Sequence, residues 1–177
     1  MTFNTAIDTS LINDARRLEC EMDGLYFARY FLKNHIGAKM IIGRHHALIQ
    51  AALDRTILSP FDPDFIPRLI INVPPGYTKT LLASIFYMAR GLAINPRNRF
   101  LHLSYSSDLA LQNSATTRDI VHSYEFQEMW SIVTKDDTRS KKTWWTEQTG
   151  GIRAASTSRI RAAIPGSRRW SSNRRRS

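Results

Sequence analysis

The residues with the clearest chemical potential in this sequence are Lys79 and Thr80, within the stretch LIINVPPGYTKTLLAS at residues 69–84. An ammonium group beside a hydroxyl, where a turn leads into a helix, is typical of loops that bind phosphate and Mg²⁺. The free N–H groups and positive dipole end of such a helix attract anions. We therefore predict a phosphate site in which Lys79 contacts the phosphates.

The loop departs from the usual phosphate-binding pattern, G-x-x-x-x-G-K-[ST]. When the pattern is aligned on Lys79, its two glycines fall on Val73 and Thr78, so Gly76 alone remains inside the loop. The lysine itself favours phosphate binding, because a cation in the first helical turn opposes the dipole by about 0.3–1 kcal/mol unless an anion offsets it. Prolines cannot donate N–H bonds, so the cradle must begin after Pro75. The expected cradle residues are Gly76, Tyr77, Thr78, Lys79 and Thr80. The alternative is a plain strand–turn–helix connection with a surface lysine.

The elements that must position this loop predict an α/β fold. The apolar run at residues 68–73 is typical of a strand buried on both faces of a parallel sheet. With a helix over 79–95 and a second strand over 99–105, it would form a βαβ unit, which is right-handed by default. Apolar spacing and capping residues predict further helices over 11–35, 45–58, 106–123 and 124–130, and turn residues predict a hairpin around 149–151.

Composition limits the classes of protein to which the chain can belong. The net charge of +10 arises in the tail, because residues 151–177 carry eight arginines and no acid, whereas residues 1–150 carry 17 basic and 15 acidic side chains. A single cysteine excludes a disulfide framework and predicts a reducing, cytoplasmic setting. Neither a signal peptide nor an apolar run long enough to span a bilayer is visible, so no membrane partner is expected.

The stretch RLIINVPPGYTKTLLAS resembles the ATPase motif I region of tailed-phage terminase large subunits, the motors that package viral DNA. Many members carry a strand ending in I-N-x-P-P and a deviant Walker A loop that closes with Lys and Ser or Thr. The resemblance extends through the His-containing helix at 43–57, the S-Y-S turn at 104–106 and the Trp-containing hairpin at 144–157. It covers roughly residues 35–157.

The resemblance implies a partial P-loop NTPase core of the ASCE type, with a parallel sheet, flanking helices and an N-terminal helical segment. ATP would be the substrate and Mg²⁺ the cofactor, with Thr80 as the metal ligand through its hydroxyl. In the intact family the partners are double-stranded DNA, the terminase small subunit and the portal protein. The protein would be encoded by a phage or prophage and located in the cytoplasm of the host cell. A homo-oligomer is expected only of a full-length protein.

The same resemblance predicts a truncated protein. The expected organisation is an N-terminal helical segment (1–60), a partial ATPase core (61–157) and an Arg/Ser-rich disordered tail (158–177). No Asp or Glu follows Glu147, so the Walker B acids and the nuclease carboxylates are missing, and we expect nucleotide binding without turnover. The composition changes near Ser158, which suggests a frameshift. The alternative function is a stand-alone nucleic-acid-binding protein that uses the arginine tail.

Several other side chains have both a chemical and a plain interpretation. For His45 and His46 we favour one packed and one exposed ring over a metal site. For Trp144 and Trp145, alternating burial on a strand is favoured over a nucleic-acid surface. Asp108 is expected to charge a helix N-terminus. Asp119 is expected on a solvated face rather than as a catalytic acid, and Arg118 is interpreted as a surface arginine rather than as an arginine finger.

Overall fold

The computed structural model describes residues 9–135 and 142–157, and within them the chain forms a three-stranded sheet in the order β1–β3–β2. β1 (Arg99–Ser104) runs parallel to β3 (Gly151–Ser156), and β2 (Thr143–Trp145) runs antiparallel to β3. The hairpin predicted around residues 149–151 is therefore confirmed, as is the strand predicted over 99–105. The mixed α/β class is also confirmed, but the sheet is mixed rather than wholly parallel.

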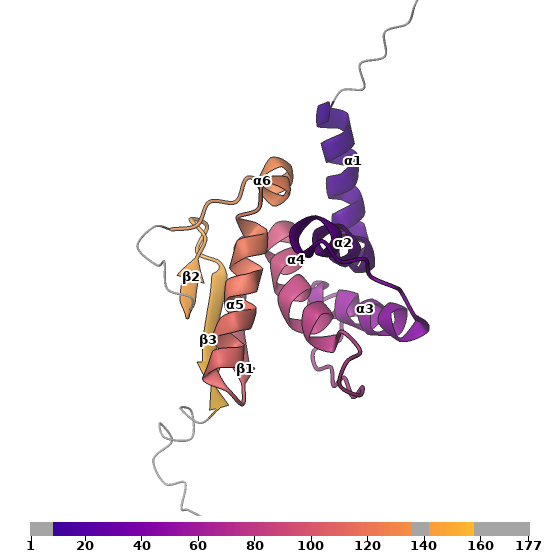
Figure 1. Cartoon of the computed structure of the whole chain (residues 1–177), viewed down its shortest axis with the longest axis vertical. Helices are drawn as coiled ribbons and strands as arrows, with labels where there is room; N and C mark the ends of the chain where they lie inside the picture. Colours follow the sequence, from indigo (N-terminus) through magenta and orange to yellow (C-terminus); the bar gives the residue numbers. More distant parts are fainter. Residues whose placement is uncertain (1–8, 136–141, 158–177) are drawn as a thin grey trace, which may run out of the picture.

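Helices cover one face of this sheet in successive layers (Figure 1). α5 packs against β1 and β3, α4 packs against α5, and α1, α2 and α3 lie on the far side of α4. The helical bounds are α1 (Thr9–Met22), α2 (Gly24–Phe31), α3 (Arg44–Ile57), α4 (Tyr87–Ile94), α5 (Ser107–Val121) and α6 (Tyr124–Trp130), with π-helical stretches η1 (Leu32–Ile36) and η2 (Leu81–Phe86).

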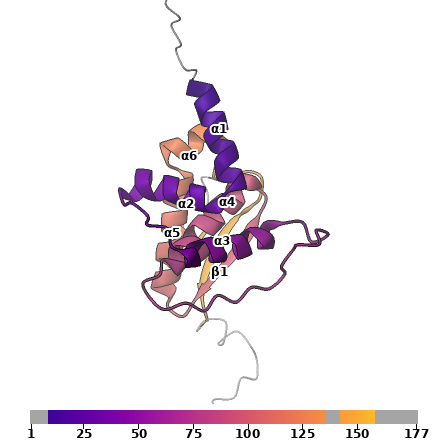
Figure 2. The ribbon, with the colours of Figure 1, turned by 90° about the vertical axis from the view of Figure 1, so that its right-hand side faces the viewer.

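The strand predicted over residues 68–73 is wrong for this structure, since these residues join no ladder. Leu69, Ile71 and Val73 pack partly against the core, whereas Ile70 is 93% exposed. The segment has the alternation of a strand, but it runs back alongside α3 without joining the sheet (Figure 2). The parallel partner of β1 is consequently β3, and the crossover between them passes through α5 and α6.

The single helix predicted over residues 11–35 is divided at Asp23. The Asp23 side chain accepts a hydrogen bond from the N–H of Leu25 at 2.7 Å, which caps the start of α2. The next residue, Gly24, lies so close to α3 that an added Cβ would be 1.9 Å from Nε2 of Gln50. The break therefore lets α2 turn away from α1 and pack closely on α3.

A buried arginine joins the N-terminal helices to α4. Arg90 is 5% exposed and forms an ion pair with Asp54 of α3. Its guanidinium also donates to the carbonyl oxygens of Cys20 at 2.9 Å and Glu21 at 2.7 Å, near the end of α1. The helix dipole favours a cation at the C-terminus of α1. Arg90 therefore links α4 to both α1 and α3.

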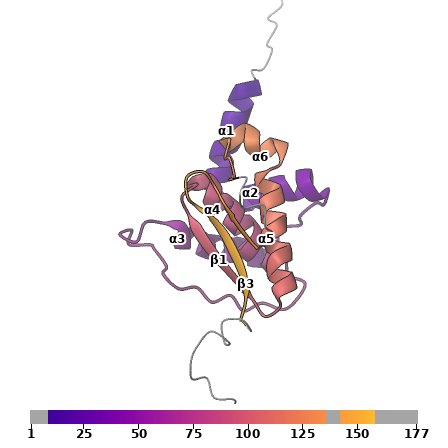
Figure 3. The same cartoon turned by 90° about the vertical axis from the view of Figure 1, so that its left-hand side faces the viewer.

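The opposite face of the sheet has no cover among the described residues. Side chains of β1 alternate, so Phe100 packs toward the helices while Leu101 and Leu103 remain 61% and 41% exposed. Figure 3 shows β1 and β3 in front of α4, with α5 beside β3. One apolar core runs from α1 to β3, but it lies on the helical side of the sheet alone.

Candidate functional site

The predicted phosphate loop encloses a pocket of about 340 Å³, lined by residues 74–81. The helix that follows begins at residue 79, so the expected turn-to-helix arrangement is present. Two loop residues have left-handed backbones, Gly76 with φ 86° and Thr78 with φ 52°. Glycine adopts this region freely, but for a β-branched residue such as Thr78 it is an unusual and strained conformation.

The side chain of His46 holds Thr78 in place. Nε2 of His46 lies 2.7 Å from Oγ1 of Thr78, while Nδ1 accepts the N–H of Gly43 at 2.9 Å. The second bond leaves the ring proton on Nε2, which therefore donates to the threonine hydroxyl. Burial, with a smaller effect of His45, lowers the pKa of His46 below 6.5, so the neutral ring is favoured.

His45 lies beside the loop on the same side. Its ring packs against that of His46 at a tilt of 44°, with 3.7 Å between centroids, and meets the ring of Tyr77 edge-on at 5.1 Å. The Nε2 atom of His45 is shielded from solvent and has no hydrogen-bond partner among the described residues. A shielded polar atom without a partner is destabilising unless a ligand or water satisfies it.

The loop offers hydrogen-bond donors that the protein does not use. Within residues 9–135 and 142–157, the N–H groups of Gly76, Tyr77 and Thr78 donate no hydrogen bond. The carbonyl of Thr78 accepts the N–H of Leu82 at 3.1 Å, which secures the loop to the first helical turn. Consecutive N–H groups next to a helix N-terminus form a concave anion site.

Lys79 supplies the positive charge of the loop. Its side chain is partly buried, and its Nζ lies 3.4 Å from the carbonyl oxygen of Val73, at the other end of the loop. In the described part of the chain it makes no ion pair. The ammonium group therefore retains donors for an anion in the pocket.

Thr80 meets part of the requirement for a magnesium ligand. It lies in the first helical turn, directly after Lys79, and its side chain is exposed. A hydroxyl suits Mg²⁺, which also retains waters and takes phosphate oxygens as ligands. Across the described residues, no group of three His, Cys, Asp or Glu side chains could hold a metal ion by itself. Within the loop, the hydroxyl of Thr80 is the side-chain group that could serve as one ligand of Mg²⁺.

The tryptophans and the two aspartates have the plain roles predicted for them, whereas Arg118 is less exposed than predicted. Trp144 is 1% exposed and donates to Oγ of Ser114 at 3.1 Å, whereas Trp145 is only partly buried. Asp108 lies in the first turn of α5, where Ser106 is the N-cap, and Asp119 is exposed. Arg118 is half-buried in the last turn of that helix.

Sequence reasoning missed the part that His46 plays in the loop. It predicted one packed and one exposed ring. His46 is packed, with 5% exposure, but His45 is partly buried rather than exposed. It did not predict the bond to Thr78, because the two residues are 32 positions apart. The Walker B acids, the frameshift and the arginine tail concern residues 158–177, which lie outside the described residues.

No helix in the described part of the chain is both long and apolar enough to cross a membrane. Comparisons of this chain with protein families, curated proteins and solved structures gave no match.

Proposed function

We propose that the loop at residues 74–81 binds the phosphates of a nucleoside triphosphate as its Mg²⁺ complex. In this proposal the chain carries the motif I region of a tailed-phage terminase large subunit, the ATP-driven motor that packages double-stranded DNA. The sequence resemblance suggests the family, and the loop geometry supports the chemistry. The observation that carries the proposal is the set of unused N–H donors at Gly76, Tyr77 and Thr78, beside Lys79.

The chemistry of the site favours a polyphosphate over other anions. The residues that line a pocket of about 340 Å³ include three with unused N–H donors, one ammonium group and the first turn of a helix. A carboxylate could not engage this many separated donors, whereas a chain of phosphates has enough oxygens to do so. When bound, Mg²⁺ would neutralise part of the phosphate charge, and the Thr80 hydroxyl would hold it.

The strain at Thr78 supports the same proposal. A non-glycine residue in the left-handed region typically costs about 1 kcal/mol or more, and such strain clusters at ligand sites. Here the bond from His46 to the hydroxyl of Thr78 offsets part of the cost. A surface connection without a ligand would gain nothing from this arrangement.

The experiment is a calorimetric titration of the 177-residue chain with ATP and Mg²⁺. We expect Lys79→Ala to weaken binding about tenfold or more, because a charge-assisted hydrogen bond contributes about 1.5–3 kcal/mol. Arg97→Ala is the matched control. Arg97 is exposed in the turn before β1, and its substitution removes the same charge as Lys79→Ala. Equal affinity in wild type and Lys79→Ala would contradict the proposal.

A further inference from the structure

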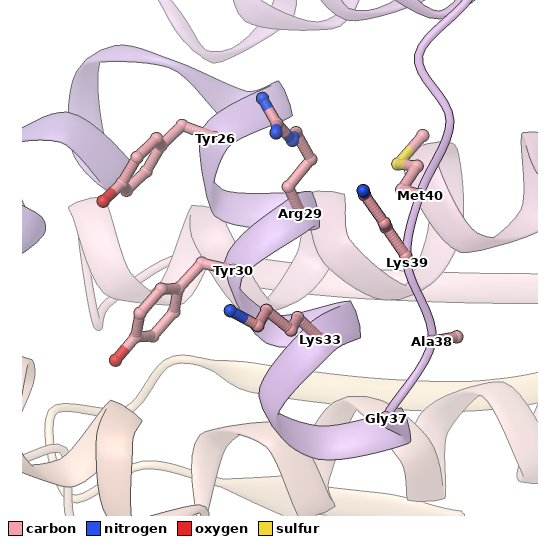
Figure 4. A pocket seen from close by; sticks show the side chains of 8 residues that line it. All are labelled: Tyr26, Arg29, Tyr30, Lys33, Gly37, Ala38, Lys39 and Met40. Atoms are coloured by element: carbon pink, nitrogen blue, oxygen red, sulfur yellow. The ribbon is translucent and has the colours of Figure 1, made fainter.

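A second and larger pocket lies where η1 ends and the chain turns back along α2. It has a volume of about 550 Å³. Figure 4 shows the rings of Tyr26 and Tyr30 projecting from consecutive turns, with the ammonium group of Lys33 beside Tyr30. The residues that give the pocket its chemistry are Tyr26, Arg29, Tyr30, Lys33, Lys39 and Met40.

A turn at Gly37 gathers the positive charges of this pocket. Gly37 has φ 72°, a left-handed conformation that reverses the chain after η1. Lys39 is thereby carried back to the pocket that Arg29 and Lys33 line from the helix, and its side chain points toward that helix (Figure 4). The three cations thus come from two separate segments.

These cations are not needed to complete the helix end. The N–H of Gly37 donates to the carbonyl of Lys33 at 3.1 Å, and the N–H of Ala38 donates to that of Leu32 at 3.3 Å. These backbone bonds close the C-terminus without side chains. Arg29 and Lys33 are favourable near a helix C-terminus, but the dipole gives no reason for Lys39, which lies beyond it.

The pocket has no internal counter-charge. Its lining includes no Asp or Glu, and Arg29, Lys33 and Lys39 form no ion pair within the described ranges. The tyrosines supply none either, because a hydrogen bond with Glu19 raises the pKa of Tyr26 to about 12 and burial raises that of Tyr30. Both rings stay neutral near pH 7. The lining of the pocket therefore carries three cations and no carboxylate, and the nearby Glu19 is engaged by its hydrogen bond with Tyr26.

The rings add a flat apolar surface to the charges. Tyr26 and Tyr30 stack with 12° between their planes and 6.4 Å between their centroids. A base cannot enter between rings at that spacing. The guanidinium of Arg16 lies over Tyr30, 6.0 Å from the ring centroid, so a base would have to lie against the part of the pair that this group leaves open. Met40 provides a further apolar contact of adaptable shape. Stacking on aromatic rings beside a basic groove is the usual way in which proteins hold unpaired bases.

We propose that this pocket, which we call the Tyr26–Met40 pocket, binds a nucleotide unit. The phosphate would lie among Arg29, Lys33 and Lys39, and the base against the two tyrosines. The unit comes either from a free mononucleotide or from single-stranded nucleic acid, which offers the same chemistry. A duplex is disfavoured because its bases are stacked on one another. The Tyr26–Met40 pocket is separate from the 74–81 loop in its residues and in its expected ligand.

The test uses the full chain with Lys79→Ala, so that the loop does not contribute. One arm titrates AMP by calorimetry, and the other titrates a fluorescent oligothymidylate by anisotropy. We expect Lys39→Glu to weaken binding about tenfold or more in at least one arm. Arg97→Glu is the control with the same charge change and should retain affinity within about twofold of its parent. Dependence on Lys39 in the AMP arm identifies a free nucleotide, and dependence in the oligonucleotide arm alone identifies a nucleic acid.

Three results would overturn the proposal. The first is equal affinity of Lys39→Glu and Arg97→Glu in both arms, which would assign any binding to charge elsewhere in the chain. The second is a Lys39-dependent affinity for ribose 5-phosphate equal to that for AMP, which would exclude a role for the base. The third is Lys39-dependent binding of a duplex that exceeds binding of its separated strand. Lys39 lies outside the helices, so Lys39→Ala provides a second variant whose folding is not at issue.

Discussion

At the residue scale, the 74–81 loop depends on side chains that lie far apart in the sequence. Lys79 and Thr80 were identifiable from their types and from the helix that follows them. His46 was not, because its bond to Thr78 depends on how α3 packs against the returning chain. The strain at Thr78 was equally invisible, since its residue type favours an extended backbone rather than a left-handed one.

The neutral state of His46 leads to a prediction about pH. The lowered pKa means that the folded state binds this proton less readily than the unfolded state, where the pKa is near 6.5. The stability that His46 contributes is therefore present above 6.5 and is lost as the pH falls below it. We expect thermal melting to show a steeper loss of stability on acidification in wild type than in His46→Gln, which keeps an N–H donor but does not titrate.

Other histidines also titrate in this range, so the comparison must be between these two proteins. Burial lowers the pKa of His102 and of His122, and both remain in each variant. The contribution of His102 and His122 to the pH dependence of stability therefore cancels when wild type is compared with His46→Gln. Parallel melting curves for wild type and His46→Gln across the range would show that the bond to Thr78 does not depend on the neutral ring.

At the scale of elements, sequence patterns located most helices but not the segment before the loop. The α3 and α5 helices were predictable because their apolar residues recur at helical spacing between clear boundaries. The apolar run at 68–73 was misleading, because run length alone cannot distinguish a central strand from an extended segment packed on one side. Ile70 is the informative residue, since a buried strand would not leave it 93% exposed.

The contacts of Arg90 predict which single change most weakens the helical layers. We expect Arg90→Ala to destabilise the chain by about 3–5 kcal/mol, because it leaves Asp54 without its partner and two carbonyl oxygens without donors. Arg97→Ala should change stability by no more than about 0.5 kcal/mol, as is usual for exposed positions. Chemical denaturation of both variants measures the difference, and a loss below about 1 kcal/mol for Arg90→Ala would contradict this account of the packing.

At the scale of the whole molecule, the described residues form a sheet with helices on one side only. A face that exposes Leu101 and Leu103 next to an open strand edge is a site for association with other chains. We expect the 177-residue chain to self-associate in solution. Replacing both leucines with lysine should shift sedimentation toward the monomer.

The matched control for this surface is Leu109, which is 53% exposed on α5 rather than on the sheet. Leu109→Lys adds a charge without altering the open face, so it should leave self-association unchanged. A monomeric wild-type chain, or an equal effect of the α5 substitution, would show that the sheet face does not drive association.

The central claim is that the loop at residues 74–81 binds phosphate through its own backbone. The most direct measurement is the change in backbone amide NMR shifts of the full chain on addition of ATP and Mg²⁺. The account predicts the largest changes at Gly76, Tyr77 and Thr78, whose N–H groups are unused and which line the pocket. Unchanged loop amides, with shifts confined to Arg29, Lys33 and Lys39 or to the arginine tail, would contradict it.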